Sequence, residues 1–371
     1  MADIISSIPD EILLYILSFL PTKQVVATTI LCKRWNLLWR SVPSFDFVYS
    51  DDYHWHKEEE SYNHFLHSVY SFMHLRDLDQ PLRRFSLNCD ARLYDPASTD
   101  KWVRAAISGR VEHLHFKLLW NVLPSVVFSC KTLVVLKLEF LKVEDIHFFE
   151  LPLLKILHLY HVYSSEGIHL SQLFAGSPNL EDLEAENTYI CHESKFNRLP
   201  KLVRANIQAE FVPMEIVKNV EVLFIDWRRQ KDLLFDFHNL LQLQLDYMSF
   251  HINWDDVLKM LNHCPKLQTL AIGCEKDYIY SSDESHEGEV WPCSQPVPQC
   301  ISLYLKTCRL ENYKGTIDEF QFARSIMQNA KYLRTMKICA DIDANDEEKL
   351  DMIRDLSSCE KTSNSFTLSF E

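Results

Sequence analysis

One apolar pattern recurs along most of this chain of 371 residues and limits what it can fold into. The pattern is an apolar residue, two further residues, an apolar residue, one residue, and a third apolar residue, as in LVVLKL (133–138) and LLQLQL (240–245). Copies begin at positions 82, 111, 133, 154, 180, 202, 220, 240, 267, 305 and 333. Most neighbouring copies start 18 to 29 residues apart, with one gap of 38. A unit this short cannot bury its apolar side alone, so the pattern predicts stacked repeats.

The period and local form are those of leucine-rich repeats, in which each unit contributes one strand to a shared, curved sheet. Segments 170–180 and 254–267 fit helical return segments, because apolar residues recur at helical spacing and a proline lies near the end of each. The position eight residues after the first leucine often holds asparagine in such repeats. Here it holds other residues, so we expect irregular repeats: Leu141, Val162, Thr188 and Met248.

Strand alternation predicts which side chains of the repeats face solvent. If the leucines face inward, the third, fifth and seventh positions of each unit face outward. The predicted outer face is basic toward its start, with Arg84, His113, His115, Lys117, Lys137 and His158, and acidic toward its middle, with Asp182, Glu184, Glu186, Asp226 and Asp246. Two interpretations stay open: exposed positions are polar in any protein, or the charges bind a partner.

Residues 8–39 carry more apolar surface than a short segment can bury. Pro9 and the acidic residues after it open a helix, and Pro21 ends it. We expect a second helix over 23–31 and a third over 33–39. The first helix is apolar all round, and a unit of about 40 residues buries too little of its surface. Either the rest of the chain or another protein must cover it.

This segment resembles the F-box in IPDEIL (8–13), ILSFLP (16–21), CKRW (32–35), LW (38–39) and VP (42–43). F-box domains dock onto the Skp-family adaptor of cullin–RING ubiquitin ligases. The resemblance implies that Trp39 closes the inside of the helical unit. It also implies the following adaptor-binding residues: Ile8, Pro9, Ile12, Leu13, Leu20, Pro21, Cys32 and Trp35. The alternative is that these helices only cap the domain that follows.

The C-terminal end resembles a second family. Residues 278–298 are polar, acidic and rich in turn formers, and they fill the widest gap between repeats. The segments 291–315 and 320–338 then resemble the FBD domain of plant F-box proteins with leucine-rich repeats. The tail 347–370 continues that match as a helix and a final strand. We expect this region to add repeat-like units whose last element closes the solenoid.

Together these features predict an α/β fold. A three-helix F-box (1–48) is followed by a linker and helix (49–80, with the helix at 61–75). An irregular leucine-rich-repeat solenoid (81–289) and an FBD region (290–371) complete the predicted organisation.

Charge and cysteine content narrow the function class. The formal charge of −14 argues against general affinity for nucleic acid or anionic membranes. The 11 cysteines form no C-x-x-C pair, which favours reduced thiols in an intracellular protein. The apolar run 12–20 has no basic segment before it and is too short to span a bilayer. We therefore expect a cytoplasmic or nuclear protein.

Three candidate chemical sites fail on the sequence alone. Residues 341–352 begin like a calcium loop but lack its glycine and final glutamate, so they are better interpreted as a helix start. The histidines at 54, 56, 64 and 67 lack metal-ligand spacing, and Cys191-His192 lacks an orienting third group. We predict no cofactor, no metal and no catalytic site.

The resulting hypothesis is a noncatalytic subunit that recruits targets to a Skp–cullin–F-box ubiquitin ligase. The F-box would bind the adaptor, and the outer face listed above would bind a target protein. Two alternatives remain: a leucine-rich-repeat scaffold without a ligase, and a receptor that encloses a small molecule.

Overall fold

The computed structural model describes residues 7–49, 58–89, 96–143, 149–164, 168–188, 190–191, 199–208, 212–226, 235–247, 254–274, 296–363 and 366–371. The chain divides into two compact units, residues 1–201 and residues 202–371, which are described separately. Among the described residues, no helix is long and apolar enough to cross a membrane.

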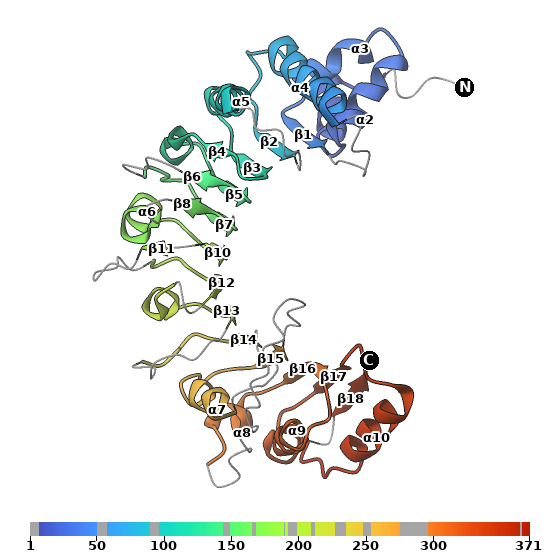
Figure 1. Ribbon diagram of the computed structural model, residues 1–371, viewed down its shortest axis with the longest axis vertical. Coiled ribbons are helices and arrows are strands. Elements are labelled where there is room, and N and C mark those ends of the chain that lie inside the picture. The colour runs from blue at the N-terminus through green and yellow to red at the C-terminus, as the bar shows by residue number, and fades with distance from the viewer. Residues whose placement is uncertain are drawn as a thin grey trace. The chain divides into compact units, whose positions relative to one another are not determined.

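Unit 1 contains a parallel sheet of six strands. Its strands follow chain order as β1 (Ser44–Tyr49), β2 (Arg84–Cys89), β3 (His113–Leu118), β5 (Val135–Glu139), β7 (Ile156–Tyr160) and β10 (Asp182–Glu186). Short strands on the return path form two smaller sheets: β4 (Val122–Leu123), β6 (Lys142–Val143) and β8 (Tyr163–Ser164), then β9 (Ile168–His169) and β11 (Ile190–Cys191). Figure 1 shows the six main strands side by side, with the return segments along one side of them.

The helices of unit 1 gather before the repeats and on their return path. They are α1 (Asp10–Leu17), α2 (Thr22–Ala27), α3 (Trp35–Leu38), α4 (Glu58–Leu75), α5 (Pro96–Ser108) and α6 (Leu170–Gly176). Two 3-10 turns extend the short helices, at Thr28–Ile30 and Trp39–Ser41. The expected helices at 23–31 and 33–39 are therefore shorter α-helical segments that end in tighter turns.

Unit 2 repeats the same plan. Its strands are β12 (Arg204–Gln208), β13 (Val222–Asp226), β14 (Gln242–Tyr247), β15 (Thr269–Cys274), β16 (Thr307–Tyr313), β17 (Thr335–Ala340) and β18 (Thr367–Phe370), all parallel and in chain order. Its helices are α7 (Trp254–Asn262), α8 (Gln299–Leu303), α9 (Ile317–Asn329) and α10 (Asp346–Ser357). β18 is the last strand in the order of this sheet.

The repeat pattern fixes where eleven of the strands begin. All eleven predicted copies form strands, and each strand starts two residues after the first apolar residue of its copy. Burial alternates along β3, where Leu114, Phe116 and Leu118 are buried while His113, His115 and Lys117 are half-exposed. The alternation predicted for the repeats is confirmed, because the inner residues of each strand stack on those of the next.

The short return-path strands were not predicted, and one strand of the main sheet of unit 1 was missed. β1 pairs with β2 in parallel, with Phe45 beside Phe85 and Phe47 beside Leu87. It precedes the first copy of the pattern and crosses the predicted boundary at residue 48. The alternation in SFDFVY (44–49) was the available signal. Its phenylalanines pack against Phe72 of α4 at ring-centroid distances of 5.7 and 5.4 Å, which couples the sheet to that helix.

The helices of unit 2 begin with strong local signals. Thr316 caps α9 and Asn345 caps α10, and each forms a capping box with the glutamate three residues later. The interpretation of residues 341–352 as a helix start is confirmed, since the Asn345 side chain accepts a hydrogen bond from the Glu348 backbone at 3.0 Å. The tail helix and final strand were also predicted correctly.

Candidate protein-interaction surfaces

The N-terminal helices enclose a small core. It consists of five buried residues: Leu13, Leu17, Val25, Leu38 and Val42. Trp35 and Trp39 are half-buried against this core, and Trp39 also contacts Phe72 of α4 at a ring-centroid distance of 4.8 Å. Trp39 therefore packs inward, as expected, and also joins the helical segment to α4.

An ion pair holds the beginning of this segment in place. The Arg34 guanidinium donates to Asp10 Oδ1, with Nε at 2.7 Å, and also donates to the backbone carbonyl of Ile8. These contacts tie the start of α1 and the residue Ile8 before it to the residue that precedes α3. They fix Ile8 and Pro9 at the edge of the segment with Pro9 exposed.

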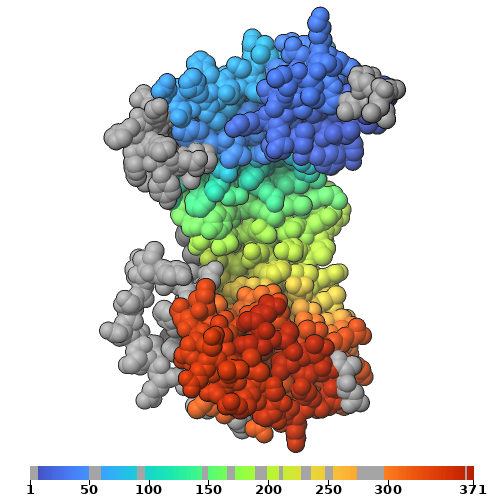
Figure 2. All heavy atoms as spheres, turned by 90° about the vertical axis from the view of Figure 1, so that its right-hand side faces the viewer, coloured from blue at the N-terminus to red at the C-terminus, as the bar shows by residue number. Residues whose placement is uncertain are grey.

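Large apolar side chains remain at the surface around that core. Among the described residues, seven of the twenty exposed large apolar side chains lie within residues 12–37, with exposed fractions from 46% to 89%: Ile12, Tyr15, Ile16, Phe19, Ile30, Leu31 and Leu37. In Figure 2 the described N-terminal residues (darkest blue) form a continuous part of the surface of unit 1. This concentration matters because large contiguous apolar patches mark interaction sites.

The predicted adaptor-binding residues divide by exposure. Pro9, Ile12, Pro21 and Cys32 are exposed, while Ile8, Leu20 and Trp35 are half-buried. Leu13 is 1% exposed and cannot present its side chain to another protein, so its assignment needs correction. Leu13 and Leu17 are four residues apart on α1 and both face the core. The sequence did not distinguish this inward stripe because the helix is apolar all round.

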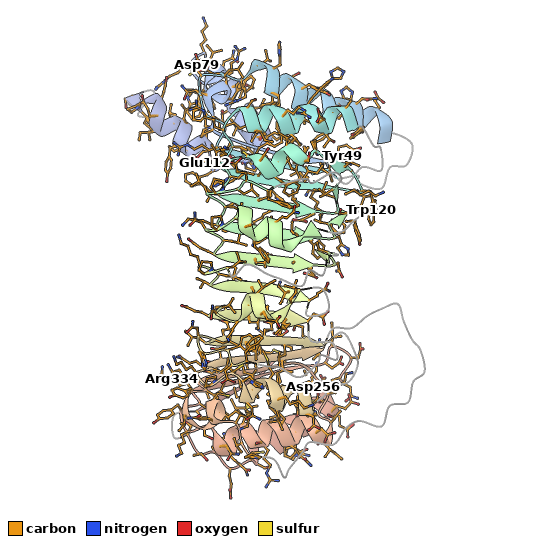
Figure 3. All side chains as sticks on the ribbon, turned by 90° about the vertical axis from the view of Figure 1, so that its left-hand side faces the viewer. Tyr49, Asp79, Glu112, Trp120, Asp256 and Arg334 are labelled. Atoms are coloured by element: carbon orange, nitrogen blue, oxygen red, sulfur yellow. The ribbon has the colours of Figure 1, made fainter. Side chains whose placement is uncertain are left out.

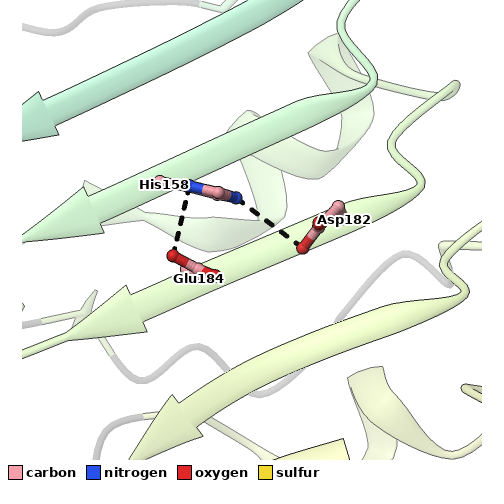
Figure 4. A group of neighbouring side chains, drawn as sticks. All are labelled: His158, Asp182 and Glu184. Carbon is pink, nitrogen blue, oxygen red and sulfur yellow. Dashed lines mark ion pairs between the residues drawn. The ribbon is translucent and has the colours of Figure 1, made fainter. Parts of the chain in front are cut away.

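The outer face of the unit 1 sheet carries cross-strand contacts between histidines and carboxylates. His115 on β3 lies 2.8 Å from Glu139 on β5, measured from Nε2 to Oε1. His158 on β7 lies between Glu184 and Asp182 of β10, with Nδ1 3.1 Å from Glu184 Oε2 and Nε2 3.8 Å from Asp182 Oδ1. Figure 4 shows the imidazole between the two carboxylates.

These pairs modify the predicted charge gradient. The structure brings the basic residues of β2, β3, β5 and β7 and the acidic residues of β10 onto one sheet face: Arg84, His113, His115, Lys117, Lys137, His158, Asp182, Glu184 and Glu186. Glu139 and Tyr160 also lie on this face and were missed. Within the described part of the chain, histidine–carboxylate contacts connect the basic and acidic strands.

Asp226 and Asp246 belong to unit 2. They lie directly opposite each other on β13 and β14, and each is near a glutamine amide. Gln208 Nε2 lies 3.4 Å from Asp226 Oδ2, and Gln244 Nε2 lies 3.1 Å from Asp246 Oδ2. Because they are in the other unit, these two aspartates are considered separately from the face of unit 1.

An aromatic cluster follows the strands of unit 1 and was not predicted. Residues just past β3, β5, β7 and β10 adopt positive φ: Trp120, Phe140, His161 and Asn187, at φ 59°, 56°, 49° and 47°. The His161 ring stacks on Phe140 at 4.9 Å, and Trp120 packs on Tyr163 at 5.3 Å. Trp120 lies at the margin of unit 1 (Figure 3). Bulky residues rarely adopt this conformation, and such strain concentrates at functional sites.

Hydrogen bonds order the same cluster. Asn187 Nδ2 lies 3.2 Å from His161 Nε2, and His161 Nδ1 lies 3.1 Å from the Tyr163 hydroxyl. Burial lowers the pKa of His161. A neutral imidazole that accepts from Asn187 and donates to Tyr163 satisfies both contacts.

Buried thiols are inert in this fold. Burial raises the pKa of Cys300 and of Cys308 to about 12. Such thiols stay protonated near neutral pH and are poor nucleophiles. Other candidates lie outside the description: His54, His56 and His192, the side chain of Cys191, and residues 278–295 of the predicted loop.

A small hollow bears on the receptor alternative. Its volume is about 190 Å³, and it lies in unit 2 between β16 and α10, lined in part by Tyr313, Glu348 and Asp355. Pockets for drug-sized ligands typically measure about 300–1,000 Å³ and are mainly apolar. This hollow is smaller and acidic, so it gives no support to a receptor.

Both ends and the middle of the chain match models of known protein families. Residues 5–47 match the family model described as F-box domain, and residues 294–338 match FBD. Residues 99–207 match the model described as FBD-associated F-box protein At5g56370, LRR repeats.

Several curated proteins of Arabidopsis thaliana are similar over most of their length. FBD-associated F-box protein At5g38590 is 28% identical, over 91% of this chain and 94% of the relative. F-box/FBD/LRR-repeat protein At4g26340 is 27% identical over the whole of both chains. The chain thus matches F-box, FBD and LRR domain models and is similar to F-box/FBD/LRR-repeat proteins across most of its length. F-box/LRR-repeat protein At4g14103 is 38% identical over a shorter span, 49% of each chain.

The domain matches relate the exposed helices to the repeats. F-box/LRR proteins are typically noncatalytic adaptors, and the F-box generally binds Skp1-type adaptors in ligase complexes. The exposed apolar residues of 12–37 in this chain lie within the segment that matches the F-box model.

Proposed function

We propose that this protein is the substrate-recognition subunit of a Skp–cullin–F-box ubiquitin ligase. The F-box would bind the Skp-type adaptor, and the outer sheet face of the repeats would hold a target protein. The FBD region would close the C-terminal end of the solenoid. The ligase then acts by proximity, because the complex raises the effective concentration of the target near the ubiquitin carrier.

The observation that carries the proposal is the apolar surface of residues 12–37. Seven large apolar side chains are exposed in a segment whose own core contains only five buried residues. Covering one such side chain stabilises a complex by about 1.5–3 kcal/mol. A partner that covered several of them would gain enough to offset the cost of association.

The adaptor surface that we propose differs from the sequence prediction at one residue and extends it. Leu13 is left out because its side chain is buried. The other predicted contacts stay: Ile8, Pro9, Ile12, Leu20, Pro21, Cys32 and Trp35. Exposed apolar residues of the same segment join them: Tyr15, Ile16, Phe19, Ile30, Leu31 and Leu37.

The target surface is proposed on unit 1. The aromatic cluster of Trp120, Phe140, His161 and Tyr163 adjoins the charged sheet face, and Lys117 lies over the Phe140 ring at 5.6 Å. Aromatic residues beside charged groups resemble the anchors of protein interfaces.

Matched substitutions test adaptor binding. The full-length protein is co-expressed with a Skp-type adaptor, and the affinity is measured by titration calorimetry. Ile12→Asp and Leu31→Asp place a charge in the proposed interface and should weaken binding by about 2 kcal/mol or more, roughly 30-fold. Ile317→Asp and Leu350→Asp are controls, because they place the same charge on exposed apolar residues outside the F-box segment. Leu350 is 60% exposed, close to the 62% of Leu31.

The results separate the alternatives. The controls should bind like wild type, and all four variants should keep the circular dichroism spectrum of the folded protein. A wild-type chain that forms no complex with the adaptor would favour a repeat scaffold without a ligase. Equal losses in the controls would mean that the binding does not use the F-box surface.

A further inference from the structure

His158, Asp182 and Glu184 form a group on the sheet face of unit 1 that the adaptor role does not use. His158 on β7 lies directly opposite Glu184 on β10, and Asp182 is two residues earlier on the same strand. One donor atom from each residue lies within 4.8 Å of the others, and all three residues are half-buried. Figure 4 shows the three side chains facing one another.

The two imidazole nitrogens of His158 have different surroundings. Nδ1 lies 3.1 Å from Glu184 Oε2, a hydrogen-bond distance. A carboxylate only accepts, so Nδ1 must carry the proton. In the neutral ring, Nε2 then holds a lone pair. Nε2 is buried, has no hydrogen-bond partner within the described part of the chain, and faces Asp182 Oδ1 at 3.8 Å. A buried acceptor that faces another acceptor is unfavourable.

We propose that a divalent transition-metal ion, with Zn²⁺ the best fit, binds between His158 Nε2 and Asp182 Oδ1. Bonds of about 2.0–2.2 Å from nitrogen and oxygen to zinc can span a donor separation of 3.8 Å. Glu184 would orient the imidazole through Nδ1, the usual role of a carboxylate behind a metal-bound histidine. Water would complete the coordination.

Charge and donor type favour this class of ion. Lys137 of β5 lies opposite His158 on the other side. One ammonium against two carboxylates leaves a net negative charge at the site. An imidazole donor suits zinc and similar metals better than calcium or magnesium, which prefer oxygen ligands alone.

A proton is the competing occupant. A doubly protonated His158 would also carry positive charge between the carboxylates. The separation of 3.8 Å argues against it, because an N–H···O hydrogen bond spans about 2.7–3.2 Å. The distance fits an interposed ion better than a shared hydrogen.

The same face supplies a matched control. His115 Nε2 lies 2.8 Å from Glu139 Oε1, and His115 Nδ1 lies 3.5 Å from Ser86 Oγ. Both nitrogens of His115 therefore face a hydrogen-bonding group, and one of these groups is a hydroxyl and not a carboxylate. This histidine–carboxylate pair should not bind an ion.

Zinc titration of the full-length, metal-free protein tests the proposal. Titration calorimetry at pH 7.5 should show that His158→Gln and Asp182→Asn each lose one equivalent of Zn²⁺ relative to wild type. Comparison with wild type removes the contribution of zinc that binds to cysteines and histidines elsewhere in the chain. Glu184→Gln should keep that equivalent with affinity about 10- to 100-fold weaker. His115→Gln should bind like wild type.

Two results would overturn the metal site. One is an unchanged zinc stoichiometry in both His158→Gln and Asp182→Asn, with each variant folded by circular dichroism. The other is a metal-free wild type whose melting temperature rises between pH 7.5 and 5.5, a rise abolished in His158→Gln, with no added stability from Zn²⁺. That pattern would identify a proton as the occupant. Neither result depends on adaptor binding.

Discussion

Similar apolar residues are buried in the repeat strands of unit 1 but exposed in its N-terminal helical segment. In the strands, Leu114, Leu136 and Leu157 are fully buried because each strand stacks on the next. In the helices, Ile12 and Leu31 lie at the surface around a core of five residues. A repeat obtains its cover from its neighbours in the chain, whereas a short helical unit has too few neighbours to do so. The difference shows where this protein depends on a partner.

The largest expected effect tests that contrast by removing the same atoms in both regions. Leu136→Ala in β5 should lower the free energy of unfolding by about 2–5 kcal/mol, because it leaves a cavity in a packed core. Leu31→Ala should change it by about 0.5 kcal/mol or less, since the side chain is already in water. Urea denaturation of the two variants measures both. A large loss for Leu31→Ala would show that this residue is covered within the chain and would remove the contrast.

A second prediction compares helix starts. α9 and α10 have capping boxes at Thr316 and Asn345, whereas α1 begins after Pro9 with no side-chain cap. Thr316→Ala and Asn345→Ala should each cost about 1 kcal/mol of stability, because each leaves backbone donors of the first turn unpaired. Pro9→Ala should cost clearly less. Thermal unfolding ranks the stability losses of the three variants. A larger loss for Pro9→Ala than for the two capping variants would contradict the prediction.

The smallest effect concerns pH and the sheet face. Burial, and then the charge of Arg84, lowers the pKa of His113 below its ordinary 6.5, and burial lowers the pKa of His161. The two histidines therefore bind protons more readily in the unfolded chain than in the folded one. Their contribution to the free energy of unfolding is complete above pH 6.5 and is lost as the pH falls below it. The free energy of unfolding should change by about a few tenths of a kcal/mol, because solvent screens these half-exposed groups.

His113→Gln measures that contribution. The variant should lose less stability than wild type between pH 7.5 and 5.5 in urea titrations. His67→Gln, on the exposed side of α4, is the control and should follow the wild-type curve. A His113→Gln variant whose stability falls as steeply as wild type would show that the ring is not held neutral by the fold.

Much of the fold could be predicted because its signals are local. Each strand begins at a fixed offset from the first apolar residue of its repeat, so the pattern positioned all eleven. Helix α7 followed from helical spacing and α10 from its acidic first turn. β1 was missed because its alternating SFDFVY stands outside the repeat and before the first leucine pattern. The inward face of α1 was missed because a helix with apolar residues on every side has no amphipathic pattern that would distinguish its buried face.

What the sequence alone determined is the order of elements, the alternation of each strand, and the surplus of apolar residues in 8–39, since these depend on residues close together in the chain. Only the tertiary structure decided that Leu13 faces inward, that Phe140 stacks on His161, and that His158 lies between Asp182 and Glu184. Those contacts join residues about 20 to 30 positions apart, and the register between stacked repeats sets them. Register depends on how whole units pack, which no single stretch of sequence encodes.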